Sequence, residues 1–129
     1  LMDAFVFCNR VLGFVNAPAM MQHVVRALQH VTVDVSDYQK KRDYLYDVLT
    51  EAGYRVFKPE GAFYMFPESP VEDEMLLVEA LQRHGVLVVP GRGFGMPGYF
   101  RISYCVDQRV LEGAAPGFRA VAKELGAAG

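Results

Sequence analysis

Apolar side chains recur three or four residues apart in four stretches of the chain, as they do on the buried face of an amphipathic helix. The first predicted helix follows Pro18. The second begins at Ser36, where Ser36 and Gln39 form a capping-box pattern, and it stops at Gly53. These two helices fill most of the first half of the chain.

The third predicted helix has the clearest boundaries. We expect Ser69 to cap it, Pro70 to take its first position and Gly85 to end it. The last helix is expected over residues 107–125, with a break or kink at Pro116-Gly117, because a proline inside a helix removes a hydrogen bond and clashes with the preceding turn.

Four short runs rich in β-branched or aromatic residues lie between these helices and predict strands. They are YRVFK from Tyr54, AFYMF from Ala62, VLVVP from Val86 and YFRISY from Tyr99. The expected order is helix, helix, strand, strand, helix, strand, strand, helix. This order predicts an α+β fold, in which helices pack on a small, mostly antiparallel sheet. We expect residues 1–129 to form a single domain of this kind.

Arg101 lies in the middle of the last predicted strand. Side chains alternate along a strand, so Phe100 and Ile102 should face the core and Arg101 the other side. A half-buried guanidinium needs an anionic partner, and its planar fork matches a carboxylate. The sequence leaves two candidates for that partner, a carboxylate of this protein or one from a ligand.

Composition narrows the classes of partner. The chain has 129 residues, of which 52% are hydrophobic and 22% charged, with a formal net charge of −2. This composition is globular, and it predicts no nucleic-acid partner and no membrane association. The cysteines Cys8 and Cys105 are expected to be free thiols in a reducing compartment, which suggests the cytoplasm. His23 and His30 are seven residues apart, too far for a metal pair, so we expect no metal site.

The stretch GFGMPG, residues 93–98, matches a dinucleotide-binding pattern in letters alone. That site requires a helix directly after the glycines, whereas a strand is predicted here and Pro97 lies inside the motif. The stretch is therefore predicted to be a turn-rich loop.

Three motifs in order resemble the C-terminal small domain of class I/II aminotransferases of fold type I, the aspartate aminotransferase-like enzymes. They are GAFY at residues 61–64, PGRGFG at 90–95 and FRIS at 100–103. The stretch NAPAMMQ from Asn16 is similar to the family's segment entering the small domain. The resemblance covers nearly the whole chain.

This resemblance implies an activity and roles for four residues. The family uses pyridoxal 5′-phosphate to transfer an amino group between an amino acid and a 2-oxo acid. Arg101 would bind the substrate α-carboxylate, with Phe63 and Tyr64 near the substrate entrance. Asn16 would approach the cofactor site of a partner subunit in a homodimer.

The family's Schiff-base lysine context is absent from the sequence. No catalytic residue is therefore expected here, and the resemblance implies the C-terminal domain of a larger enzyme, inactive and without bound cofactor by itself. The strongly apolar first sixteen residues also suggest a chain cut from a longer protein. Three alternatives stay open: a carbon–sulfur lyase on the same fold, an aminotransferase-like effector domain of a transcription regulator, and a free-standing binding module. The sequence does not indicate which amino acid is the donor or which 2-oxo acid is the acceptor.

Overall fold

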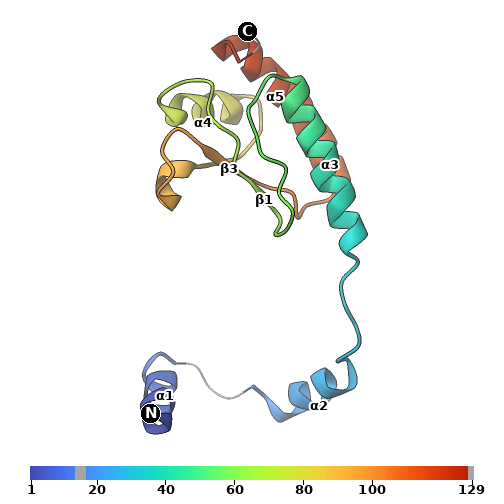
Figure 1. The fold of residues 1–129 in the computed structure, drawn as a ribbon, viewed down its shortest axis with the longest axis vertical. Helices are drawn as coiled ribbons and strands as arrows, with labels where there is room; N and C mark the ends of the chain where they lie inside the picture. The colour runs from blue at the N-terminus through green and yellow to red at the C-terminus, as the bar shows by residue number, and fades with distance from the viewer. Residues whose placement is uncertain (14–16, 128–129) are drawn as a thin grey trace. The chain divides into compact units, whose positions relative to one another are not determined.

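The computed structural model of the chain describes residues 1–13 and 17–127, and the chain divides into two compact units, residues 1–33 and 34–129 (Figure 1). The first unit contains α1 (Met2–Val11) and α2 (Ala19–Ala27). Helix α2 confirms the helix predicted after Pro18, whereas α1 was not predicted, because its apolar residues show no clear period. All described residues of the first unit are exposed.

The sheet of the second unit has three strands in the order β1-β3-β2, and both neighbouring pairs are antiparallel. Tyr64 lies opposite Ser103, and Val89 lies opposite Arg101, so β3 is the central strand. The predicted small antiparallel sheet is confirmed, although each strand is shorter than expected. The strands are β1 (Tyr64–Met65), β2 (Val89–Pro90) and β3 (Phe100–Ser103).

Three helices cover the sheet: α3 (Val35–Glu51), α4 (Glu74–Arg83) and α5 (Gln108–Leu125). Helices α3 and α5 lie side by side, and α4 packs against α5 and β2 (Figure 1). Their apolar faces meet the buried face of β3 in one core, which confirms the predicted α+β class. The largest fully buried side chains of this core include Tyr104, Phe100, Phe118, Leu45, Leu49, Met65, Leu77 and Leu81.

Aspartates cap the helices of the second unit, which corrects two predicted caps. Helix α3 begins one residue before Ser36, because the Asp34 carboxylate accepts a hydrogen bond from the Ser36 N–H at 2.9 Å. Helix α4 begins at Glu74, not after Ser69, because Asp73 accepts from the Met75 N–H at 3.1 Å. A carboxylate also interacts favourably with the positive end of the helix dipole, which a serine hydroxyl does not.

Of the break or kink predicted at Pro116-Gly117, the break does not occur. Helix α5 continues through Pro116, because residues on both sides of it are held in the core. Ala115 and Phe118 are 2% and 1% exposed, so tertiary packing compensates for the missing backbone donor.

The predicted strand from Tyr54 does not form. Within the described residues, its one backbone hydrogen bond to the segment opposite runs from the Glu68 N–H to the Arg55 carbonyl at 2.9 Å. The neighbouring Pro67 cannot donate, which limits further pairing. The Tyr54 side chain is nonetheless buried, and its hydroxyl donates to the Phe118 carbonyl at 3.1 Å.

No helix in the described part of the chain has the length and apolar character needed to cross a bilayer.

Candidate functional site

Strand β3 presents Arg101 on the face away from the core. Phe100 and Ile102 are 0% and 6% exposed, whereas Arg101 and Ser103 are half-buried on the other face. This confirms the predicted alternation. Because β3 pairs on both sides, two neighbouring strands fix the backbone that carries Arg101.

Two aromatic rings pack against the Arg101 guanidinium. Its Cζ atom lies 4.3 Å from the centroid of the Tyr64 ring and 4.1 Å from that of Phe94. Such contacts attract the cation through the ring quadrupole and contribute about 0.5–2 kcal/mol each. The N–H donors of a guanidinium lie in its plane, so rings on its faces leave the donors at its edge for an acceptor.

Arg101 differs from the other arginines of residues 34–127. Each of those six forms an ion pair with a carboxylate, and Arg101 forms none with any described residue. An internal carboxylate partner, one of the two candidates from the sequence, is thus not found in the described residues. A half-buried, unpaired cation is costly to folding, so this arrangement favours a ligand as the partner. The six paired arginines are Arg42, Arg55, Arg83, Arg92, Arg109 and Arg119.

Tyr64 reaches Arg101 from a strained segment. Ala62 has φ 61°, a left-handed conformation that costs about 1–2 kcal/mol for an L-residue with a side chain. The Tyr104 hydroxyl donates to the Ala62 carbonyl at 2.9 Å and holds this conformation. The adjacent Phe63 ring lies 4.5 Å from the Tyr64 ring, centroid to centroid, and is 40% exposed.

Phe94 reaches Arg101 from the loop of residues 91–98. The loop opens with a short 3-10 helix, η1 (Gly91–Phe94), and closes on itself, because the Gly91 N–H donates to the Tyr99 carbonyl at 2.7 Å. A Cβ atom on Gly91 would lie 2.2 Å from the Met96 carbonyl oxygen, so only glycine fits there. As predicted, the loop is turn-rich and leads into a strand.

A buried carboxylate anchors the same loop. The Glu74 side chain is 1% exposed and accepts hydrogen bonds from Arg92 Nε at 2.7 Å and from the Gly98 N–H at 3.1 Å. Arg92 also donates to Asp73. These donors favour the charged carboxylate and lower the pKa of Glu74 to about 2, the Arg92 side chain contributing most.

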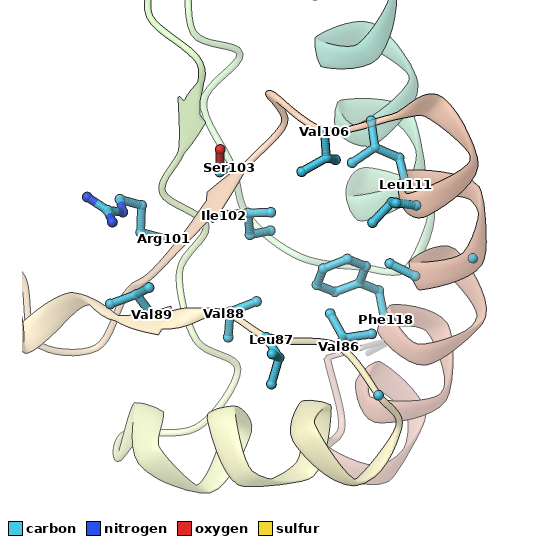
Figure 2. A pocket seen from close by; sticks show the side chains of 14 residues that line it. Val86, Leu87, Val88, Val89, Arg101, Ile102, Ser103, Val106, Leu111 and Phe118 are labelled. Carbon is cyan, nitrogen blue, oxygen red and sulfur yellow. The ribbon is translucent and has the colours of Figure 1, made fainter.

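An apolar cavity of 410 Å³ lies beside β3. It is lined by residues 85–89, by the β3 residues Arg101, Ile102 and Ser103, by Val106 and by residues of α5. Figure 2 shows Ile102, Leu111 and Phe118 around it, with the Arg101 guanidinium pointing away from Phe118. Arg101 is itself among the residues that line the cavity, at the end away from Phe118.

A comparison with protein-family models matches residues 7–117 to the family described as aminotransferase class I and II. The chain belongs to this family. The matched span contains the GAFY, PGRGFG and FRIS motifs, so the resemblance expected from them is confirmed.

Curated relatives and solved structures of aminotransferases resemble this chain. It is 38% identical over 103 residues to a probable aspartate/prephenate aminotransferase of Rickettsia prowazekii, covering 66% of this chain and 25% of the relative. It is 39% identical over 86 residues to the aspartate/prephenate aminotransferase of Thermus thermophilus, covering 65% and 22%. An amino transferase structure from Eubacterium rectale superimposes with TM-score 0.84 and 41% identity, over 90% of this chain and 29% of that one. The chain thus spans about a quarter of the length of these aminotransferases.

Class I/II aminotransferases in general depend on pyridoxal 5′-phosphate, and neither of the two lysines that pair with carboxylates in this chain suits its Schiff base. A lysine that forms a Schiff base must lose its proton easily. Lys41 Nζ lies 2.7 Å from Asp37, which raises the lysine pKa, and Lys58 Nζ lies 2.9 Å from Asp43.

Of the four predicted site residues, the structure brings three together. Tyr64 contacts Arg101 and Phe63 contacts Tyr64, whereas Asn16 lies outside the described residues. The roles of the Phe94 ring and of the Glu74 carboxylate were not predicted from the sequence. Glu74 had a signal, because it occupies the apolar face of its helix, in register with the buried residues Leu77, Ala80 and Leu81.

Proposed function

We propose that the chain is the substrate-carboxylate-binding part of a pyridoxal-phosphate-dependent aminotransferase. The intact enzyme would transfer an amino group between an amino acid and a 2-oxo acid. Arg101 would bind the α-carboxylate of the substrate through its in-plane N–H donors, with Tyr64 and Phe63 beside the bound substrate. The residues of this chain bind and orient; the group transfer would depend on residues outside it.

The unpaired guanidinium of Arg101 carries this proposal. It is half-buried, held by two rings and without a carboxylate partner among the described residues. A planar anion with two oxygens is the acceptor that matches the two parallel N–H groups of such a fork. Each charge-assisted hydrogen bond contributes about 1.5–3 kcal/mol, enough to orient a small substrate.

The names of the relatives support a carboxylate as the shared feature. They act on aspartate and prephenate, on aromatic amino acids and on LL-diaminopimelate. The side chains of these substrates differ in charge and shape, whereas each substrate has a carboxylate next to the reacting carbon. A residue that serves all of them would bind that carboxylate.

The partner subunit and the cofactor of the intact enzyme would lie outside this chain. We expect the intact enzyme to be a homodimer, with Asn16 near the cofactor site of the partner subunit. Since the family's Schiff-base lysine context is absent from the sequence, residues 1–129 alone should not transaminate.

Replacing Arg101 in the intact enzyme tests the proposal. Arg101→Ala should raise KM for the amino acid and lower kcat/KM by about 100-fold, because truncating one partner of a hydrogen-bonded charge pair costs about 2–5 kcal/mol. Arg101→Lys should fall between, since it keeps the charge and loses the fork. Steady-state kinetics and calorimetric titration with propanoate, compared with propanamide, measure the effect.

Arg119→Ala is the matched control. Arg119 is an exposed arginine of α5 that pairs with Glu51 at 3.2 Å, so its loss should leave KM within about twofold of the original value. Arg101→Ala kinetics equal to those of the control would contradict the proposal.

A further inference from the structure

Glu74 is the charged side chain that the second unit buries in its core, and the proposed function gives it no role. Among the described residues it is the fully buried charged group, 1% exposed at the first position of α4. Burying a carboxylate is costly unless hydrogen bonds compensate for lost water. Here the compensating donors come from Arg92 and Gly98, which both lie in the loop of residues 91–98.

The contacts of Glu74 tie both ends of that loop to α4. Oε1 accepts from Arg92 Nε at 2.7 Å and from the Arg92 backbone N–H at 3.3 Å. Oε2 accepts from Arg92 Nη2 at 3.2 Å and from the Gly98 backbone N–H at 3.1 Å. The fork of one arginine and two backbone donors thus meet on one carboxylate. We call Glu74 and Arg92 the loop clamp.

The loop clamp encloses Phe94. Phe94 follows Arg92 by two residues and precedes Gly98 by four, so the two backbone donors bound to Glu74 flank it. On the sheet side, the edge of the Phe66 ring meets Phe94 at 5.8 Å between centroids and an interplanar angle of 88°. The clamp sets the backbone of the loop, and Phe66 supports the ring 4.1 Å from Arg101.

We propose that Glu74 and Arg92 are positioning residues that hold Phe94 against the Arg101 guanidinium, so that its N–H edge meets the substrate carboxylate in one orientation. This inference rests on the proposed function and deepens it. A guanidinium that loses one flanking ring gains rotamers, and binding a carboxylate must then also order the side chain. The clamp would therefore act on substrate affinity without touching the substrate.

Variants of the clamp in the intact enzyme test this inference. Glu74→Gln keeps the shape of the side chain and removes its charge. Arg92→Gln removes the guanidinium of a half-exposed side chain. Because Arg92 is half-exposed, the Arg92 variant can still be tested if Glu74→Gln does not fold. Each should weaken propanoate binding by about 5- to 20-fold and raise KM for the amino acid similarly, with kcat within about threefold.

The contact between the Phe94 ring and the Arg101 guanidinium can be followed separately by NMR. In an NMR spectrum the Arg101 side-chain N–H proton, identified by its loss in Arg101→Lys, should be shifted upfield by the two rings. Phe94→Ala should reduce that shift, and Glu74→Gln should reduce it in the same direction. Combined with Phe94→Ala, the clamp variants should cause no further loss of propanoate affinity, because the ring they position is gone.

Arg83→Gln is the matched control, since it removes an exposed arginine–glutamate pair at the other end of the same helix. Clamp variants that lower Tm but keep propanoate affinity and the Arg101 proton shift at the control's values would overturn the inference, leaving the clamp a purely structural contact. An Arg101→Ala enzyme with unchanged KM would overturn the proposed function itself, so the two failures are distinguishable.

Discussion

Glu74 shows how the contacts of one side chain make stability depend on pH. Its pKa in the folded protein is about 2, against an ordinary value of 4.5, because Arg92 and the Gly98 N–H hold the charged form. As pH falls, the unfolded chain takes up the proton first. The contribution of this carboxylate to the free energy of unfolding is therefore complete above pH 4.5 and is lost as pH falls toward 2.

This linkage gives a prediction at the scale of one residue. At pH 7 Glu74→Gln should have a lower Tm than the original protein, and the difference should shrink between about pH 4.5 and pH 2. Thermal unfolding followed by circular dichroism across this range measures it. Glu79→Gln, an exposed glutamate of the same helix, should stay close to the original Tm. A Glu74→Gln difference that is constant with pH would show that the clamp carboxylate does not titrate as described.

At the scale of elements, helix α5 contains two glycines whose surroundings differ. A Cβ atom on Gly117 would lie 2.7 Å from Val86 Cγ2 and 3.4 Å from His84 Cβ, whereas one on Gly113 would meet nothing within 4 Å. Gly117→Ala should therefore lower the free energy of unfolding by about 1–2 kcal/mol through overpacking. Gly113→Ala should raise it by about 0.5–1 kcal/mol, because alanine is the better helix former.

Denaturant titration of the two alanine variants decides between packing and propensity. Equal effects of either sign would mean that α5 does not approach the His84–Val86 segment as closely as the structure has it.

Helices were predictable at this scale because their apolar faces repeat over many residues, while their starts were not. Asp34 and Asp73 compete with nearby serines for the capping role, and charge decides in favour of the aspartates. The break expected at Pro116 does not occur, because packing of the flanking residues overrides a local rule. Strands of two to four residues offer few positions to read, so their extents were overestimated.

At the scale of the whole molecule, the buried side chains belong to residues 34–127. Among the described residues, none of the first unit is buried. We therefore predict that residues 34–129 fold without residues 1–33, with a cooperative thermal transition and the same helix content in that region. Circular dichroism and a dispersed NMR spectrum check this, and a shortened chain without a cooperative transition would contradict it.

Features of the candidate site that depend on a local sequence pattern were predictable, whereas contacts between residues distant in the sequence were not. Alternation along β3 places Arg101 and its buried neighbours correctly. The contact of Arg101 with Phe94 depends on how a loop folds back over the sheet, and the contact of Glu74 with Gly98 joins residues 24 positions apart. No local pattern encodes either contact, although a glutamate on an apolar helix face hinted at the second.

The unpaired Arg101 has a consequence in terms of selection. A half-buried guanidinium without a counterion among the described residues loses hydration that the two rings replace only in part. Selection for a stable fold alone would give little reason to keep a charge there. Under the proposed function, the domain would keep this charge for recognition at some expense of stability.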